Sequence, residues 1–365
     1  RFYLFLCDLE KAINYINLAL DLTPSVVEFY MVAAKIFKHS YMMDKCILAY
    51  NKARLLDLGD RYLNAKMGKI YARESQIDKS LEVMKEFVAD PLTEENIKFS
   101  ETLWYLNEMG CAYLTKKNIL RSHYCFQSVI DVFLNILKDQ VDFYNFCLRR
   151  YMLKDLYHTI VYLDGMAKNK YVLQALSKID LIYNYLKANE TNKELEESFL
   201  KEYEQMKQDY GLTQYEFKNI AELLKTIESN YYDILLKLQK ITKNYEIHYI
   251  CVKYFLKKQK LLMALKSIII LSENKNNYYY VQSAKLINKY LEDNMDTLKD
   301  KEIIVNLIKK YVKDGDDKIE YKEDNKLNEI RFKLYIKDSF NNPKENGEIV
   351  NEFVNYYDKN QLRKL

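Results

Sequence analysis

A segment of 21 residues occurs three times in the chain, and this repetition constrains the fold more than any other feature. The copies begin at Ala33, Met67 and Met109, so that the second follows the first by 34 residues and the third follows the second by 42. We expect the eight extra residues around VADPLTEEN (88–96), because Pro91 breaks a helix. Such copies predict structural units that stack one after another along the chain.

Each copy has the same internal pattern of small and aromatic residues. A small residue is followed three positions later by an aromatic one, and twelve positions later by a second small residue; the three sets are Ala34, Gly68 and Gly110, then Phe37, Tyr71 and Tyr113, then Cys46, Ser80 and Ser122. The pattern and its period resemble the tetratricopeptide repeat, in which two antiparallel helices pack closely at the small positions. We therefore predict an all-α solenoid.

Two partial copies extend the array in both directions. Ala12, Ile16 and Ala19 lie 34 residues before Cys46, Tyr50 and Ala53, and a later copy at 251–271 carries Phe255, Ala264, Ile268 and Leu271 at the same spacings. We divide the chain into tetratricopeptide-like repeats at 1–186, a polar helical connecting segment at 187–245 and C-terminal helical repeats at 246–365. Within the connecting segment we expect a solvated helix at 191–208. The stretches 313–326 and 341–348 resemble loops.

Composition supports helices and excludes several classes of function. Three prolines and seven glycines in 365 residues are too few for many strands and tight turns. A net charge of +4 does not by itself predict a nucleic-acid footprint, which needs a clustered basic face. No apolar run approaches the roughly 20 residues of a membrane span. The six cysteines form no C-x-x-C pair and the four histidines are scattered, so we expect no metal site and interpret the cysteines as buried thiols of a cytoplasmic protein.

Trp104, the only tryptophan, is predicted to face a groove rather than its own repeat. Helical residues advance by about 100° each, so Tyr113, nine positions later, points about 180° away from Trp104. Tyr113 belongs to the packing set of the repeat, and the opposite face of the first helix lines the concave groove of such solenoids. Tyr62 holds the equivalent place one repeat earlier. Large aromatic residues with a basic rim are typical of a binding face. Packing of Trp104 beneath the insertion remains an alternative.

Basic residues gather at the same predicted groove. Lys35 and Lys69 are equivalent positions one repeat apart, and the set of candidate polyanion ligands is Lys35, Lys38, Arg61, Lys66 and Lys69, with Arg73 beside them. Like charges on one concave face repel each other unless an anion neutralises them. We therefore predict a bound polyanion, with solvated lysines as the alternative.

Several longer stretches resemble the auxiliary subunit of the NatA N-terminal acetyltransferase complex. They are AINYINLALDLTPSVVEFYMVAAKIFKH (12–39), DRYLNAKMGKIY (60–71), LWYLNEMGCAY (103–113), DQVDFYNFCLRR (139–150) and YFLKKQKLLMALKSI (254–268). Family members are more than twice as long, and the chain, which lacks an initiator Met, is expected to be the C-terminal half of one. The family's Lys/Arg-rich segment is not visible near 190–245, and Tyr62 stands where Phe is usual.

The resemblance implies a non-catalytic scaffold. A GNAT-fold catalytic partner binds acetyl-CoA and acetylates nascent N-termini, and the auxiliary chain anchors it to the ribosome, with contacts to ribosomal RNA through basic helices as a further possibility. The partner is contacted by Arg61, Tyr62 and Trp104, and inositol hexakisphosphate is held between the subunits by basic side chains. The chain has no cofactor of its own, and its localisation is cytoplasmic and ribosome-associated.

Two other classes of function are alternatives to the scaffold. A tetratricopeptide adaptor grips the C-terminal tail of a chaperone through a Lys/Asn clamp, and the groove lysines allow this, although Glu108 beside Trp104 fits it poorly. An enzyme would need a nucleophile such as Cys111 with a base such as His123 beside it. No such pairing is visible in the sequence, and no catalytic residue is predicted.

Overall fold

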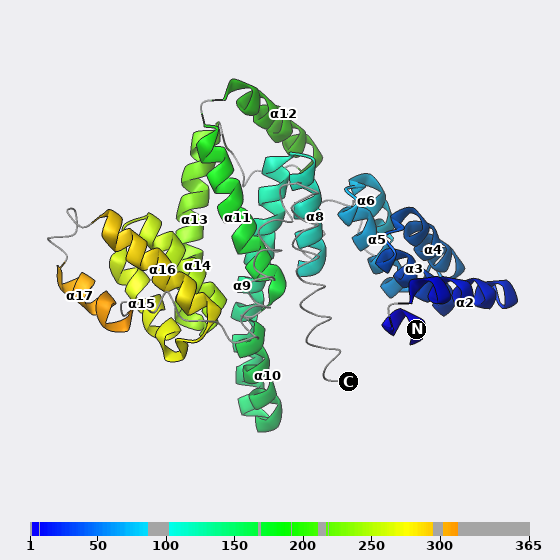
Figure 1. Cartoon of the computed structure of the whole chain (residues 1–365), viewed down its shortest axis with the longest axis horizontal. Coiled ribbons are helices and arrows are strands. Elements are labelled where there is room, and N and C mark those ends of the chain that lie inside the picture. The colour runs from blue at the N-terminus through cyan, green and yellow to red at the C-terminus, as the bar shows by residue number, and fades with distance from the viewer. Residues whose placement is uncertain are drawn as a thin grey trace. The chain divides into compact units, whose positions relative to one another are not determined.

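The computed structural model (Figure 1) describes residues 2–6, 8–86, 102–166, 169–190, 192–210, 217, 219–294 and 302–312. Every regular element in these ranges is a helix, which confirms the predicted all-α class. The expected insertion at 88–96 and the expected loops at 313–326 and 341–348 lie outside them. By their contacts the residues fall into two compact units, one from 1–128 with 201–216 and the other from 129–200 with 217–365. The division at 186 and 245 rests on repeats and composition, and it stays a prediction.

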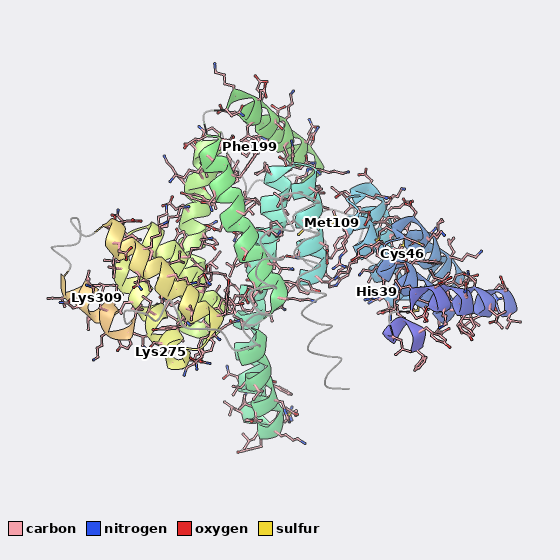
Figure 2. The ribbon with its side chains drawn as sticks, in the orientation of Figure 1. His39, Cys46, Met109, Phe199, Lys275 and Lys309 are labelled. Atoms are coloured by element: carbon pink, nitrogen blue, oxygen red, sulfur yellow. The ribbon has the colours of Figure 1, made fainter. Side chains whose placement is uncertain are left out.

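Unit 1 is an array of antiparallel helix pairs. Its helices are α1 (Phe2–Phe5), α2 (Leu9–Leu22), α3 (Val27–His39), α4 (Met43–Leu56), α5 (Arg61–Arg73), α6 (Ile77–Lys85), α8 (Leu103–Thr115) and the beginning of α9 (Ile119–Arg149). The three predicted copies are the pairs α3/α4, α5/α6 and α8/α9, and the half-copy at Ala12–Ala19 lies in α2. Ala12, Ile16, Ala34 and Cys46, the last labelled in Figure 2, are buried in one core cluster.

The small residues mark the closest approach within each pair, as predicted. Ser80 Oγ donates a hydrogen bond to the carbonyl oxygen of Gly68 at 2.8 Å, and Ser122 Oγ donates to that of Gly110 at 2.8 Å. A Cβ atom added to Gly110 would lie 2.8 Å from the ring of Phe126. The second helix therefore passes too close to tolerate a side chain at this position.

The turn inside each pair has the same backbone, which the sequence did not reveal. Residues with φ between 56° and 63° occur at Tyr41, Ser75, Lys117, Tyr151 and Gln259. The first four follow one another at the 34, 42 and 34 residue offsets of the repeat. At each turn the next amide donates to a carbonyl five residues back, as Met42 does to Phe37 at 2.9 Å and Gln76 to Tyr71 at 2.8 Å. This is the helix-ending motif that usually employs glycine.

The turn at Tyr151 explains the length of α9. This helix has 31 residues, because its second half takes the place of the first helix of a further pair, whose second helix is α10 (Leu153–Met166). The rest of unit 2 comprises α11 (Lys170–Ala188), α13 (Ile220–Ile241), α14 (Tyr245–Lys257), α15 (Leu261–Leu271), the short 3₁₀ turn η1 (Ser272–Asn274), α16 (Tyr278–Asp293) and α17 (Glu302–Tyr311). The predicted late repeat is the pair α14/α15, where Phe255 and Ala264 are fully buried.

The predicted connecting segment contains more core than its polar composition suggests. The helix expected to be solvated is α12 (Lys193–Tyr210), yet Phe199 (labelled in Figure 2), Glu202 and Met206 on one of its faces are buried. Glu202 accepts the backbone amides of Leu120 and Arg121 and so caps the start of α9. The expectation of a solvated helix is therefore wrong for this face. Its buried residues are three or four positions apart, and charged residues are frequent in the rest of the helix, so the sequence of the helix is polar overall. The following helix α13 packs on α11 and α14.

Candidate functional site

The candidate site lies on the first helices of three consecutive repeats, α3, α5 and α8, within unit 1. We call it the α3–α5–α8 surface and define it by Lys35, Lys38, Arg61, Tyr62, Lys66, Lys69, Arg73, Trp104 and Glu108. On α5 the four residues Tyr62, Lys66, Lys69 and Arg73 follow one another at three or four positions and therefore share one face of the helix. The first helices α5 and α8 contact each other, and α5 also packs on α4.

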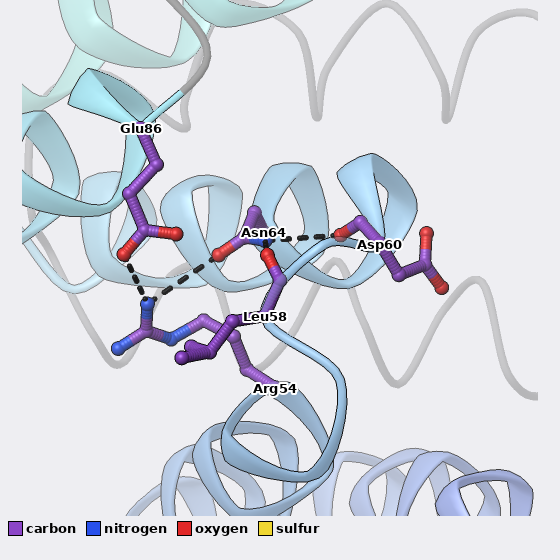
Figure 3. Close-up of polar contacts among 5 residues, drawn as sticks. All are labelled: Arg54, Leu58, Asp60, Asn64 and Glu86. Atoms are coloured by element: carbon purple, nitrogen blue, oxygen red, sulfur yellow. Dashed lines mark hydrogen bonds and ion pairs between the residues drawn. The ribbon is translucent and has the colours of Figure 1, made fainter.

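Polar contacts hold the start of α5, which carries Arg61 and Tyr62 (Figure 3). The Asp60 carboxylate accepts the Tyr62 amide at 2.7 Å and caps the helix. Asn64, which is fully buried, donates to the carbonyl oxygens of Leu58 and Asp60 at 2.9 and 3.0 Å. Arg54 Nη1 donates to Asn64 at 3.4 Å and to Glu86 at 3.0 Å, so it ties α4 and the end of α6 to α5. Arg61 and Tyr62 project from this fixed turn, and Tyr62 is 46% exposed.

Trp104 lies in the first turn of α8 and is half-buried, whereas its neighbours Leu103 and Tyr105 are buried. The Lys69 ammonium is 5.6 Å from the centre of the Trp104 ring, a cation–π distance, and Tyr105 meets that ring edge to face. Trp104 thus contacts the first helix of the preceding repeat, while part of the Trp104 side chain stays exposed to solvent. Its relation to the insertion at 88–96 falls outside the described residues.

Glu108, one helical turn after Trp104, joins the two repeats. Arg73 donates to both of its carboxylate oxygens, from Nε at 3.0 Å and from Nη2 at 2.8 Å, and Lys69 Nζ lies 3.1 Å from Oε1. Burial alone would raise the pKa of Glu108, but the hydrogen bond and charge of Arg73, together with Lys69, outweigh it and lower that pKa. Glu108 is therefore ionised, and it forms ion pairs with Lys69 and Arg73 of α5.

The structure gathers some of the predicted cations and leaves others apart. Lys38 shares the environment of Lys69, Arg73 and Glu108: burial lowers its pKa, and the positive charge of Arg73 lowers it further. Lys66 Nζ lies 5.0 Å from the centre of the Tyr62 ring, and Lys35 and Arg61 are exposed. The sequence already sets Glu108 beside Trp104, and the structure adds its two partners on α5, Arg73 and Lys69.

The alternative of an enzyme with a Cys111–His123 pair finds no support in the geometry. His123 is buried, neither of its ring nitrogens has a hydrogen-bond partner, and burial lowers its pKa to about 4. It therefore does not activate Cys111. In the part of the chain that the structure describes, no group of three or more His, Cys, Asp or Glu residues could hold a metal ion. None of the described helices is both long and apolar enough to cross a membrane.

Repeated helix pairs that carry an aromatic and charged face on their first helices define the class of protein, a helical-repeat solenoid. Residues 1–225, more than half of the chain, match the family model of the N-terminal acetyltransferase A auxiliary subunit, and the chain belongs to this family. The matched range contains the whole α3–α5–α8 surface.

Individual relatives agree with the family. The mouse protein N-alpha-acetyltransferase 16, NatA auxiliary subunit, is 26% identical over 188 residues, which are 49% of this chain and 21% of the mouse protein. The Arabidopsis thaliana N-terminal acetyltransferase A complex auxiliary subunit NAA15 is 26% identical over 188 residues, 52% of this chain and 20% of that protein. The alignments thus span about a fifth of the curated relatives.

A solved structure, described as Naa15/Naa10 bound to HypK-THB, shares the fold. It superposes with a TM-score of 0.61 at 22% identity and covers 82% of this chain and 43% of the chain compared. The likeness supports the helical solenoid over most of the sequence.

Proposed function

We propose that the chain is a non-catalytic scaffold that binds a GNAT-fold catalytic acetyltransferase subunit through the α3–α5–α8 surface. The observation that carries the proposal is the family match over residues 1–225, which includes every residue of that surface. The structural relative whose description pairs Naa15 with Naa10 supports a two-subunit assembly. Arg61, Tyr62 and Trp104 are the proposed contacts, because they lie at the starts of α5 and α8, are not buried, and can offer a partner aromatic area and hydrogen bonds.

In this proposal the chain positions the partner and takes no part in the chemistry. The partner binds acetyl-CoA and transfers the acetyl group to the N-termini of nascent chains, in the cytoplasm and at the ribosome. Basic helices of the chain are proposed to contact ribosomal RNA. The chaperone-tail alternative is less favoured, because residues 1–225, which include the whole surface, match the auxiliary-subunit family.

Co-expression tests the proposal. The chain and its catalytic partner should co-purify as an active acetyltransferase, whereas the chain purified alone should transfer no acetyl group. Turnover by the chain in the absence of the partner would overturn the non-catalytic assignment. Failure of the two chains to associate would overturn the scaffold.

We further propose that inositol hexakisphosphate binds at the subunit interface against Lys35, Lys38, Arg61, Lys66 and Lys69. Lys35 and Lys69 occupy equivalent places one repeat apart, so one ligand with many phosphates can reach both. Glu108 balances part of the positive charge near Lys69, and the remaining cations favour an anion with several charges over a single phosphate.

Calorimetry on the purified complex tests this ligand. The double variant Lys35→Glu, Lys69→Glu should lower the affinity for inositol hexakisphosphate by at least about tenfold, and the effect should shrink as salt rises. Lys45→Glu, Lys79→Glu is the matched control, because these exposed lysines are equivalent positions on the second helices α4 and α6. Equal affinity in the wild type and the first double variant would exclude the site.

A further inference from the structure

A second charged site lies in unit 2 and includes no residue of the α3–α5–α8 surface. The helices α13 and α14 pack against each other, and a cleft of about 370 Å³ opens between α13 and the turn that follows α14. It is lined by Lys225, Glu228, Tyr232, Tyr254, Lys258 and Lys260. The volume falls within the range of about 300–1,000 Å³ that small-molecule sites occupy.

The cleft carries a net positive charge, because its single carboxylate neutralises only one of its three lysines. Glu228 lies 2.6 Å from Lys258 Nζ and accepts the hydroxyl of Tyr183 at 2.8 Å. The hydrogen bond from Lys258 is the main reason that the pKa of Glu228 is lowered, so the carboxylate stays ionised and serves as the counterion of Lys258. Lys225 and Lys260 have no acidic partner among the described residues. Two uncompensated cations therefore face this cleft.

An aromatic ring and a helix start add to the binding features. Lys260 Nζ lies 3.7 Å from the centre of the Tyr232 ring, so that a cation and a flat aromatic face meet inside the cleft. Lys260 also precedes α15, whose first turn has no side-chain cap. The start of a helix carries partial positive charge and adds to the attraction for an anion.

The lysines that surround the cleft are already engaged with other side chains. Lys253 Nζ lies 3.2 Å from Asp180, and Lys257 donates a hydrogen bond to Asn184. Asp180 neutralises the charge of Lys253, whereas Lys257 keeps its positive charge, because an amide is not a counterion. The cleft itself is a bounded site of about 370 Å³, which suits a small anion better than the backbone of a long nucleic acid, which needs a continuous basic groove.

From these features we propose that the cleft binds a small phosphorylated ligand of nucleotide size, whose flat ring replaces the Lys260 ammonium on Tyr232 while Lys260 turns to the phosphates beside Lys225. The charge-assisted contacts of two lysines hold the phosphates, and stacking on the tyrosine distinguishes a nucleotide from a bare phosphate. This site goes beyond the scaffold function, because it involves neither the α3–α5–α8 surface nor the catalytic partner.

Calorimetry on the full chain, with ADP, inorganic pyrophosphate and a short single-stranded RNA as probes, tests the proposal. The wild type should bind ADP more tightly than pyrophosphate. Lys225→Ala, Lys260→Ala should weaken both by at least about tenfold. Tyr232→Leu should weaken ADP alone. The matched control Lys266→Ala, Lys285→Ala removes two exposed lysines of α15 and α16 and should bind as the wild type does.

Each remaining outcome counts against the proposal. Absence of ADP binding to the wild type would overturn it, and so would equal ADP affinity in the wild type and the Lys225, Lys260 double variant when circular dichroism shows both to be folded. If the RNA binds and the double variant weakens it while ADP does not bind at all, the cleft belongs to a nucleic-acid surface and the small ligand is wrong. None of these results bears on whether the α3–α5–α8 surface binds a catalytic subunit.

Discussion

Trp104 and Gly110 lie six residues apart on α8, and their surroundings predict opposite effects of mutation. Trp104 is half-buried with a lysine over its ring, whereas a Cβ at Gly110 would lie 2.8 Å from Phe126. Trp104→Ala should lower the stability of the chain by about 1 kcal/mol or less. Gly110→Leu should lower it by about 3 kcal/mol or more through overpacking. Urea denaturation compares the two, and equal losses would mean that Trp104 is a core residue.

His123 makes unit 1 sensitive to acid. Its pKa is about 4 in the folded chain because of burial, against roughly 6.5 when unfolded. Between these two pH values the folded chain binds fewer protons than the unfolded chain. The free energy of unfolding is therefore unaffected by His123 above about pH 6.5, and it falls as the pH is lowered towards 4, by about 3 kcal/mol in total.

The variant His123→Leu should flatten this part of the pH dependence without loss of a hydrogen bond, because neither ring nitrogen has a partner. Urea midpoints at neutral pH and near pH 4.5 measure the effect. His39→Leu, which removes an exposed histidine of α3, is the control and should leave the pH dependence unchanged. The same acid loss in wild type and His123→Leu would contradict this assignment.

At the scale of the element, the helix pairs share a turn that the side-chain pattern does not predict. The residue with positive φ is a tyrosine, serine, lysine, tyrosine or glutamine at the five turns. The repeat was detected from its small and aromatic residues, and these predict the packing in the core. The turn is set by backbone hydrogen bonds that five different sequences can make, so no residue type marks it.

This turn gives a prediction for stability. Lys117 has φ 63°, where a side chain costs about 1 kcal/mol relative to glycine. Lys117→Gly should therefore raise the stability of the chain by up to about that amount. The adjacent Lys116, with φ −80°, gains nothing from glycine, and Lys116→Gly should be neutral or destabilising. The measurement is the urea midpoint of each variant compared with that of the wild type. A lower midpoint for Lys117→Gly would contradict the account of the turn.

At the scale of the whole molecule, local periodicity predicted the helix pairs and the resemblance of longer stretches indicated the family, but neither predicted the contacts between distant segments. The spacing of Gly68 and Gly110 sufficed for the repeat, because the contacts lie within one pair. The role of Glu202 could not be predicted, since it caps α9 from more than eighty residues away. Glu108 was placed on the correct face, but its two bonds to Arg73 depend on the stacking of two repeats.

The central claim is that the α3–α5–α8 surface binds the catalytic subunit, and the affinity between the two purified chains tests it most directly. Trp104→Ala should weaken that affinity by about 2–4 kcal/mol, as expected for a central aromatic contact. Tyr157→Ala, which removes an exposed aromatic residue of α10, should leave it unchanged. Equal affinity of the wild type and Trp104→Ala for the catalytic subunit would contradict the account.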